Sequence, residues 1–246
     1  PDPECTVLRE KIGQRENIQP EHIICGNGAD DLIFRTVFAA KPKKALLLAP
    51  TFSEYEKALS AAGCEINFYA LKEENDFALG DDYINVLEGG YDIVFLCSPN
   101  NPTGGELSEQ CLLEIVTRCK RLGILPVIDM SFADFSENTV SANVLAEAGA
   151  AVIKAFTKIY AMPALRLGYM LCCDEDLLRK VSLAGQSWSV NSLAQAAGAA
   201  ALDDSDFIGR TVEYISRERR FLTEKFGWPM AMIAATSSPS GSSITL

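Results

Sequence analysis

The chain has 246 residues, of which 48% are hydrophobic and 22% charged, so it can bury the core of one large domain or two small ones. Its formal net charge is −11 and it has no Lys/Arg-rich run, which argues against nucleic acid or an anionic membrane as a partner. No apolar stretch reaches the roughly 20 residues that span a bilayer, no C-x-x-C pair occurs, and His22 is the only histidine. We therefore expect a cytoplasmic protein without a metal site, a histidine-based nucleophile or a disulfide framework.

Seven short apolar, β-rich runs alternate with helix-like segments. Strands are predicted over residues 23–25, 45–49, 66–70, 93–97, 125–128, 151–155 and 168–172. Helices are predicted over residues 30–39, 54–62, 109–121 and 140–146, and the pattern after residue 177 is all-helical, with helices over 194–202 and 207–226. Apolar runs without strict alternation suit strands that are covered on both faces. The sequence thus predicts an α/β fold, a three-layer α/β/α sandwich around a mainly parallel sheet.

The predicted helix over residues 54–62 carries a capping signal. Ser53 and Glu56 have the spacing of a capping box, in which the serine hydroxyl accepts a hydrogen bond from the backbone at Glu56. The sequence therefore predicts that Ser53 caps this helix.

Four polar or glycine-rich segments follow predicted strands. They are Gly26-Asn27-Gly28-Ala29-Asp30, the run 98–104 with sequence SPNNPTG, Asp129, and Thr157-Lys158. Because ligands of open α/β sheets bind outside the carboxyl ends of the strands, we expect these four segments to meet at one edge. The first segment opens a helix, so its free N–H groups could bind a phosphate, although an ordinary turn has the same composition. The second is a rigid turn with two adjacent amides.

Three charged side chains at this edge can be read in two ways. Asp129 could cap a helix or accept a hydrogen bond from a protonated pyridine nitrogen. Lys158 could be an ordinary solvated lysine or a Schiff-base nucleophile with a lowered pKa. Arg166, eight residues further on, could form a surface ion pair or bind a phosphate in a bidentate manner.

In combination these motifs resemble the class I/II aminotransferases, which are pyridoxal-5′-phosphate (PLP) enzymes of fold type I. The family carries a Pro-Asn-Asn-Pro-Thr-Gly loop, a strand-end Asp, a Ser/Thr-Lys motif and an Arg eight residues beyond the lysine, and the chain has all four in this order. The likeness extends from Pro1 to about Phe226. It implies PLP as cofactor, a small amino-acid substrate and a homodimer. It also implies the site residues: Lys158 as Schiff-base lysine and proton carrier, Asp129 on the pyridine nitrogen, Asn101 on the 3′-oxygen, Phe52 on the ring face, and the backbone amides of Ala29 and Asp30 with Thr157 and Arg166 on the phosphate.

Three segments resemble one branch of this family, the threonine-phosphate decarboxylases, which make the aminopropanol phosphate of the cobalamin side chain. They are residues 1–5 (PDPEC), 158–163 (KIYAMP) and 188–191 (WSVN). Phe132 also fits this branch, because many aminotransferases have a tyrosine at that place, three residues after the Asp. The substrate would then be a phosphorylated amino acid. The alternative is a histidinol-phosphate aminotransferase or a related transaminase.

Two features of the family are missing from the sequence. The tyrosine that precedes Pro-Asp-Pro and the arginine of the C-terminal domain have no counterpart, and residues 236–243 read as a linker. We expect an incomplete N-terminal segment (1–20), a PLP-binding large domain (21–203) and the truncated or atypical start of a small domain (204–246), with a frame shift near Trp228 as one explanation. A chain that binds PLP without turnover, and a nucleotide-binding α/β domain, are the remaining alternatives.

Overall fold

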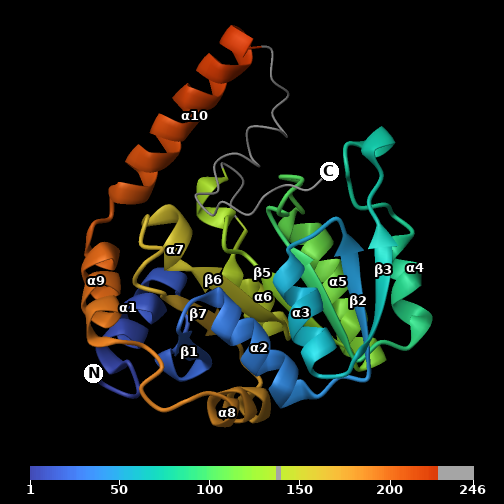
Figure 1. Ribbon diagram of the computed structural model, residues 1–246, viewed down its shortest axis with the longest axis horizontal. Helices are drawn as coiled ribbons and strands as arrows, with labels where there is room; N and C mark the ends of the chain where they lie inside the picture. Colours follow the sequence, from blue (N-terminus) through green and yellow to red (C-terminus); the bar gives the residue numbers. More distant parts are fainter. Residues whose placement is uncertain (137–139, 227–246) are drawn as a thin grey trace.

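A computed structural model describes residues 1–136 and 140–226, which form one seven-stranded sheet with helices on both faces (Figure 1). The strand order is β1-β7-β6-β5-β4-β2-β3. Neighbours from β6 to β3 run parallel, whereas β7 is antiparallel to both β6 and β1. The strands are β1 Ile23–Gly26, β2 Lys44–Ala49, β3 Glu65–Ala70, β4 Ile93–Cys97, β5 Leu125–Asp129, β6 Ala151–Ala155 and β7 Gly168–Leu171. The predicted three-layer fold is confirmed, and each predicted strand agrees with the observed one to within one residue at either end.

The helices alternate with the strands as far as β6. They are α1 Thr6–Glu16, α2 Ala29–Ala40, α3 Ser53–Ala61, α4 Tyr83–Val86, α5 Glu109–Leu122, α6 Ala142–Ala148, α7 Phe156–Ile159, α8 Glu175–Ala184, α9 Ser192–Asp203 and α10 Phe207–Phe226. The prediction missed α1, whose sequence is polar and lacks a marked apolar stripe.

The capping-box prediction is wrong. Helix α3 begins at Ser53 itself, its N-cap is Phe52, and no side chain caps it. Ser53 thus lies inside the first turn, where its hydroxyl is one position too late to cap. By contrast, α5 has a side-chain cap, because the Ser108 hydroxyl accepts a hydrogen bond from the Cys111 N–H at 3.2 Å.

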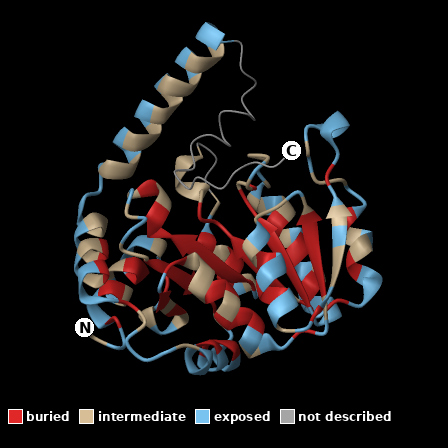
Figure 2. Cartoon of the chain, viewed as in Figure 1, coloured by how far each residue is buried: buried red, intermediate tan, exposed pale blue. Residues whose placement is uncertain are grey.

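Two apolar cores lie on opposite faces of the sheet, and the strands supply both by alternation. On β4, Val94 and Leu96 belong to the core under α1, α5, α6 and α9, whereas Phe95 and Cys97 belong to the core under α2, α3 and α8. Burying each such side chain stabilises the fold by about 1.5–3 kcal/mol. Figure 2 shows the result: every strand except the edge strand β3 is largely buried, and the helices that cover the sheet are buried only on their inner faces. A side chain's place along a strand therefore decides which helical layer it contacts.

Helix α10 extends away from the sheet (Figure 1), and none of its residues is buried. It carries exposed aromatic side chains, including Tyr214 and Phe221, beside many charged ones. Within the two described ranges, no helix is long and apolar enough to cross a membrane. The predicted linker at 236–243 and Trp228 lie outside the described residues.

Candidate functional site

The site lies where β4, β5 and β6 end, and the sheet register brings its residues together. Cys97 on β4 pairs with Asp129 on β5, so two strand ends are level with each other. β6 ends at Ala155 and the chain turns directly into α7, whose first turn carries Thr157 and Lys158. The parallel arrangement places these residues at one edge of the sheet, as the sequence predicted.

Asp129 is buried and holds two hydrogen bonds. The Tyr55 hydroxyl donates to Oδ2 at 2.7 Å, and the Ser131 N–H donates to Oδ1 at 2.9 Å. Burial raises the pKa of Asp129 above its ordinary value, although both hydrogen bonds and the nearby Lys158 act in the opposite direction. The partners of the Asp129 carboxylate therefore do not fully offset the cost of burying its negative charge. A cationic N–H group placed beside it would stabilise the ionised form.

Lys158 is half-buried, and its amine faces an aromatic ring. Its Nζ lies 5.1 Å from the centroid of the Phe132 ring. Burial lowers the pKa of Lys158, and the Arg166 charge lowers it further, while the carboxylates of Asp30 and Asp129 act to raise it. A lysine with a lowered pKa has a larger fraction of free, nucleophilic amine at neutral pH.

The third part of the site is the N-terminus of α2. Gly28 caps this helix with a φ of 89°, and a Cβ on Gly28 would lie 2.9 Å from Nη2 of Arg166. Gly168 on β7 packs so closely that a Cβ there would lie 2.7 Å from the Ala29 nitrogen. The guanidinium of Arg166 thus lies against the helix N-terminus, where both the backbone N–H groups and the helix dipole favour an anion.

The Asp30 side chain adds a contact that the sequence did not indicate. Its Oδ2 lies 3.3 Å from Arg166 Nη2, and burial raises the pKa of this carboxyl above its ordinary value. The prediction assigned only the backbone amide of Asp30 to the site. In the structure the carboxylate also holds the arginine in place.

The two asparagines of the loop over residues 98–104 differ in burial and in hydrogen bonding. Asn100 is buried, and its amide donates to the Pro50 carbonyl at 3.0 Å and to the Thr103 hydroxyl at 2.9 Å. It also accepts a hydrogen bond from the Thr51 hydroxyl at 2.9 Å. Asn101 is half-buried, and its side chain forms no hydrogen bond within residues 1–136 and 140–226. Asn100 therefore fixes the loop, and the Asn101 amide remains available to a ligand.

Tyr55 is a site residue that sequence reasoning missed. It is fully buried on α3, stacks on Phe95 with ring centroids 4.9 Å apart, and meets Phe52 edge-on at 5.6 Å. Phe52 itself is half-buried. Phe52 is the N-cap of α3, so the start of this helix brings the two rings together, and Tyr55 reaches Asp129.

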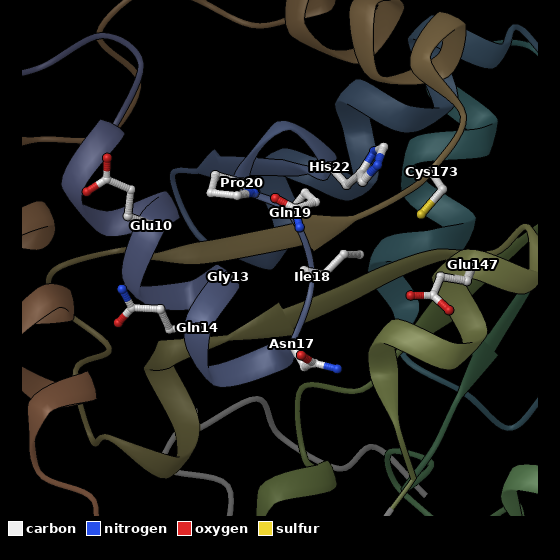
Figure 3. A pocket seen from close by; sticks show the side chains of 10 residues that line it. All are labelled: Glu10, Gly13, Gln14, Asn17, Ile18, Gln19, Pro20, His22, Glu147 and Cys173. Carbon is white, nitrogen blue, oxygen red and sulfur yellow. The ribbon is translucent and has the colours of Figure 1, made fainter.

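A separate pocket of about 460 Å³ lies between α1 and the residues around β1 (Figure 3). His22 and Cys173 lie side by side in its wall, with Glu147 nearby. None of the predicted site residues lines it. The chemistry that the sequence indicates is therefore not located in this pocket.

Comparison with known proteins assigns the chain to one family, and its relatives agree with that assignment. The sequence pattern of the family described as "Aminotransferase class I and II" matches residues 4–241. The chain is 35% identical over 221 residues to the threonine-phosphate decarboxylase of Salmonella typhimurium. The aligned region covers 89% of this chain and 60% of that protein. It is 29% identical over 230 residues to the histidinol-phosphate aminotransferase of Ruminiclostridium cellulolyticum. Here the aligned region covers 92% of this chain and 63% of that protein. The chain thus spans about 60% of the length of these curated relatives.

Solved structures show the same fold. The histidinol-phosphate aminotransferase from Clostridium acetobutylicum superposes with a TM-score of 0.83 at 24% identity, over 92% of this chain and 68% of that chain. At this identity the likeness establishes the arrangement of strands and helices and nothing finer.

Proposed function

Because the chain belongs to the aminotransferase class I and II family, we propose that it binds pyridoxal 5′-phosphate and performs amino-acid chemistry of the threonine-phosphate decarboxylase type. Lys158 would attach the cofactor covalently. The whole protein would work as a cytoplasmic homodimer on a small phosphorylated amino acid. The observation that carries this proposal is the convergence of a lysine with a lowered pKa, a buried carboxylate and a cationic helix N-terminus at one sheet edge.

The residues at the site fit the chemistry of this cofactor. A pyridinium N–H would supply the positive charge that the buried carboxylate of Asp129 lacks. A phosphate dianion would suit the Arg166 guanidinium, the amides that open α2 and the Thr157 hydroxyl. The glycine at position 28 leaves room for the arginine against the helix end, where any side chain would crowd it. Asn101 and Phe52 would contact the ring.

When bound, the cofactor supplies an electron-withdrawing ring that stabilises negative charge at the substrate α-carbon. The chain supplies the rest. Lys158 would move a proton at that carbon, and burial, which lowers its pKa, keeps more of its amine in the free-base form. Asp129 would hold the proton on the pyridine nitrogen, because a carboxylate in this dry environment interacts strongly with a nearby cation.

Two observations favour a decarboxylase over an aminotransferase. The decarboxylase relative is the more similar of the two described above, at 35% against 29% identity. Phe132, whose ring faces Lys158, has no hydroxyl with which to bind the cofactor oxygen. The second candidate function, a histidinol-phosphate aminotransferase, is supported by the second relative.

Borohydride reduction of the PLP-loaded chain, followed by peptide mapping, tests the cofactor site. We expect the pyridoxyl group on Lys158 and none on Lys154, which is only four residues away but is buried in ion pairs. A pyridoxyl group on Lys154 would refute the assignment of this loop. Lys158→Arg keeps the positive charge but should abolish the reduced adduct.

Substrate assays then separate the candidate reactions. Release of carbon dioxide from O-phospho-L-threonine without glutamate formation would support decarboxylation. Glutamate formed from histidinol phosphate and 2-oxoglutarate would establish the aminotransferase instead. A pyridoxyl group on Lys158 with neither product would mean that the chain holds the cofactor without turnover.

A further inference from the structure

A second lysine, Lys154, lies buried on the opposite side of β6 from the core that holds Ile153. Its Nζ lies 2.9 Å from Glu16 Oε1 and 3.2 Å from Asp134 Oδ1, and its side chain is only 8% exposed. The Tyr169 hydroxyl donates to the same Glu16 oxygen at 2.5 Å. These four residues, the Lys154 cluster, join α1, β6, β7 and the turn after β5. A buried lysine of this kind is stable only with its partners in place.

The pairing is strong enough to keep the lysine charged. Burial acts to lower the pKa of Lys154, but the carboxylates of Glu16 and Asp134 outweigh burial and raise the pKa. Arg15 lies 3.8 Å from Asp134, so two cations face two carboxylates and the charges balance. Tyr160 is a further titratable group near this cluster. A balanced, buried ion network has a fixed geometry, because any displacement exposes unpaired charge to an apolar environment.

Asp134 belongs to the same short turn as the ring that faces Lys158. The turn begins where the Met130 N–H donates to the Ile153 carbonyl at 2.8 Å. It continues with the Phe135 N–H donating to the Phe132 carbonyl at 3.1 Å. Phe132 and Asp134 are thus two residues apart on one hydrogen-bonded turn. One contacts Lys158 and the other contacts Lys154, four residues earlier in the chain.

We propose that Lys154 is a positioning residue: it holds Asp134, and Asp134 holds the turn over residues 130–136 so that the Phe132 ring covers the Lys158 amine. This inference rests on the proposed PLP chemistry. In that chemistry the Phe132 ring would shield the Lys158 amine from water, and the Lys154 cluster on the other face of the sheet would hold the ring in place. Lys154 acts on Lys158 only through the turn and touches neither the amine nor its substrate.

The charges around Lys158 make the effect measurable. The charged groups with the largest influence on its pKa are Asp30 on α2, Asp129 on β5, Arg166 before β7 and Cys97 on β4. If Asp134 acted directly on the amine, its loss would remove negative charge and lower the pKa of Lys158. If it acts by holding Phe132, its loss admits water and raises that pKa, because burial is the largest influence on this amine. The two mechanisms predict opposite signs.

The test uses Asp134→Asn in the cofactor-free chain. This isosteric change leaves the Lys154–Glu16 pair intact, whereas removing Lys154 would leave two buried carboxylates and threaten folding. Trace acetylation by acetic anhydride, read by mass spectrometry of each lysine peptide, follows the free amine. The midpoint of its pH dependence gives the pKa of each amine, whatever the access of the reagent. We expect the midpoint for Lys158 to rise by about 0.5 pH unit or more, which corresponds to about threefold less free amine at about pH 8.

Glu16→Gln is the matched control. It also removes one carboxylate from Lys154, but it leaves the link to Asp134, so the acetylation of Lys158 should not change. Phe132→Ala tests the last step without altering a buried charge, and it should raise the midpoint for Lys158 as Asp134→Asn does. An unchanged or lower midpoint for Lys158 in Asp134→Asn, an equal rise in Glu16→Gln, or no change in Phe132→Ala would each overturn the proposal. None of these readouts needs PLP, so failure of the proposed function would be seen separately, in the borohydride mapping.

Discussion

Replacing Asp129 by Asn should make the cofactor-free protein more stable at neutral pH, even though it removes a residue that the proposed function needs. Burying an ionised carboxylate costs several kcal/mol. Its two hydrogen bonds, at 2.7 Å and 2.9 Å, return about 1.5–3 kcal/mol each. Because the pKa of Asp129 is nevertheless raised, burial outweighs its partners. An uncharged amide of the same shape can still accept from Ser131, so we expect a gain of about 1–2 kcal/mol.

The sign of the pH dependence follows from linkage. A carboxyl whose folded pKa lies above its unfolded value of 3.8 binds a proton more readily in the folded protein, so its contribution to stability falls as pH rises through that window. The advantage of Asp129→Asn should therefore be full above the folded pKa and vanish below 3.8. In thermal melts at pH 7 the gain corresponds to roughly 2–8 °C for a chain of this size.

Urea titrations of both proteins across pH 5 to 8 provide the assay. Loss of stability in Asp129→Asn at pH 7 would contradict the reasoning, because it would show that the carboxylate is fully stabilised without a cofactor. With PLP bound the order should reverse, since Asn cannot balance the charge of a pyridinium. Tyr55→Phe serves as the companion variant: it removes the donor at 2.7 Å and should destabilise the wild-type carboxylate by about 1–3 kcal/mol.

Two further predictions concern the cofactor site. Gly28→Ala places a side chain at a backbone φ of 89° and against the Arg166 guanidinium, so it should weaken PLP binding by about tenfold or more. Binding of pyridoxal, which has no phosphate, should be nearly unaffected. Absorbance titrations with the two ligands measure both affinities. Equal losses for both ligands would argue against a phosphate site at α2. The rate of PLP capture by Lys158, trapped with borohydride at successive pH values, should rise with pH through a midpoint below the ordinary lysine value of 10.5, because burial lowers the pKa of this amine. A midpoint at or above 10.5 would exclude the shielded amine.

The sequence alone was sufficient for the strand positions and the edge at which the polar segments meet. Each strand is a short apolar run next to turn residues, and this is a local property of the chain. The four polar segments follow strands, and parallel strands place their ends together whatever their order in the sheet. For this reason the region around Asp129, Lys158 and Arg166 could be located before the fold was known.

The tertiary structure decided what each of these residues contacts. Lys154 and Lys158 are four residues apart, but the alternation of β6 points Lys154 to the core beside α1, where its partner Glu16 is 138 residues away in the chain. Tyr55 meets Asp129 across 74 residues in the same way. Sequence periodicity assigns a side chain to a face but does not identify its partner, because partners of buried charges come from distant segments that pack together only in the complete fold. The local patterns therefore placed Lys158 at the sheet edge, and the packing determined which ring and which charged groups lie near it.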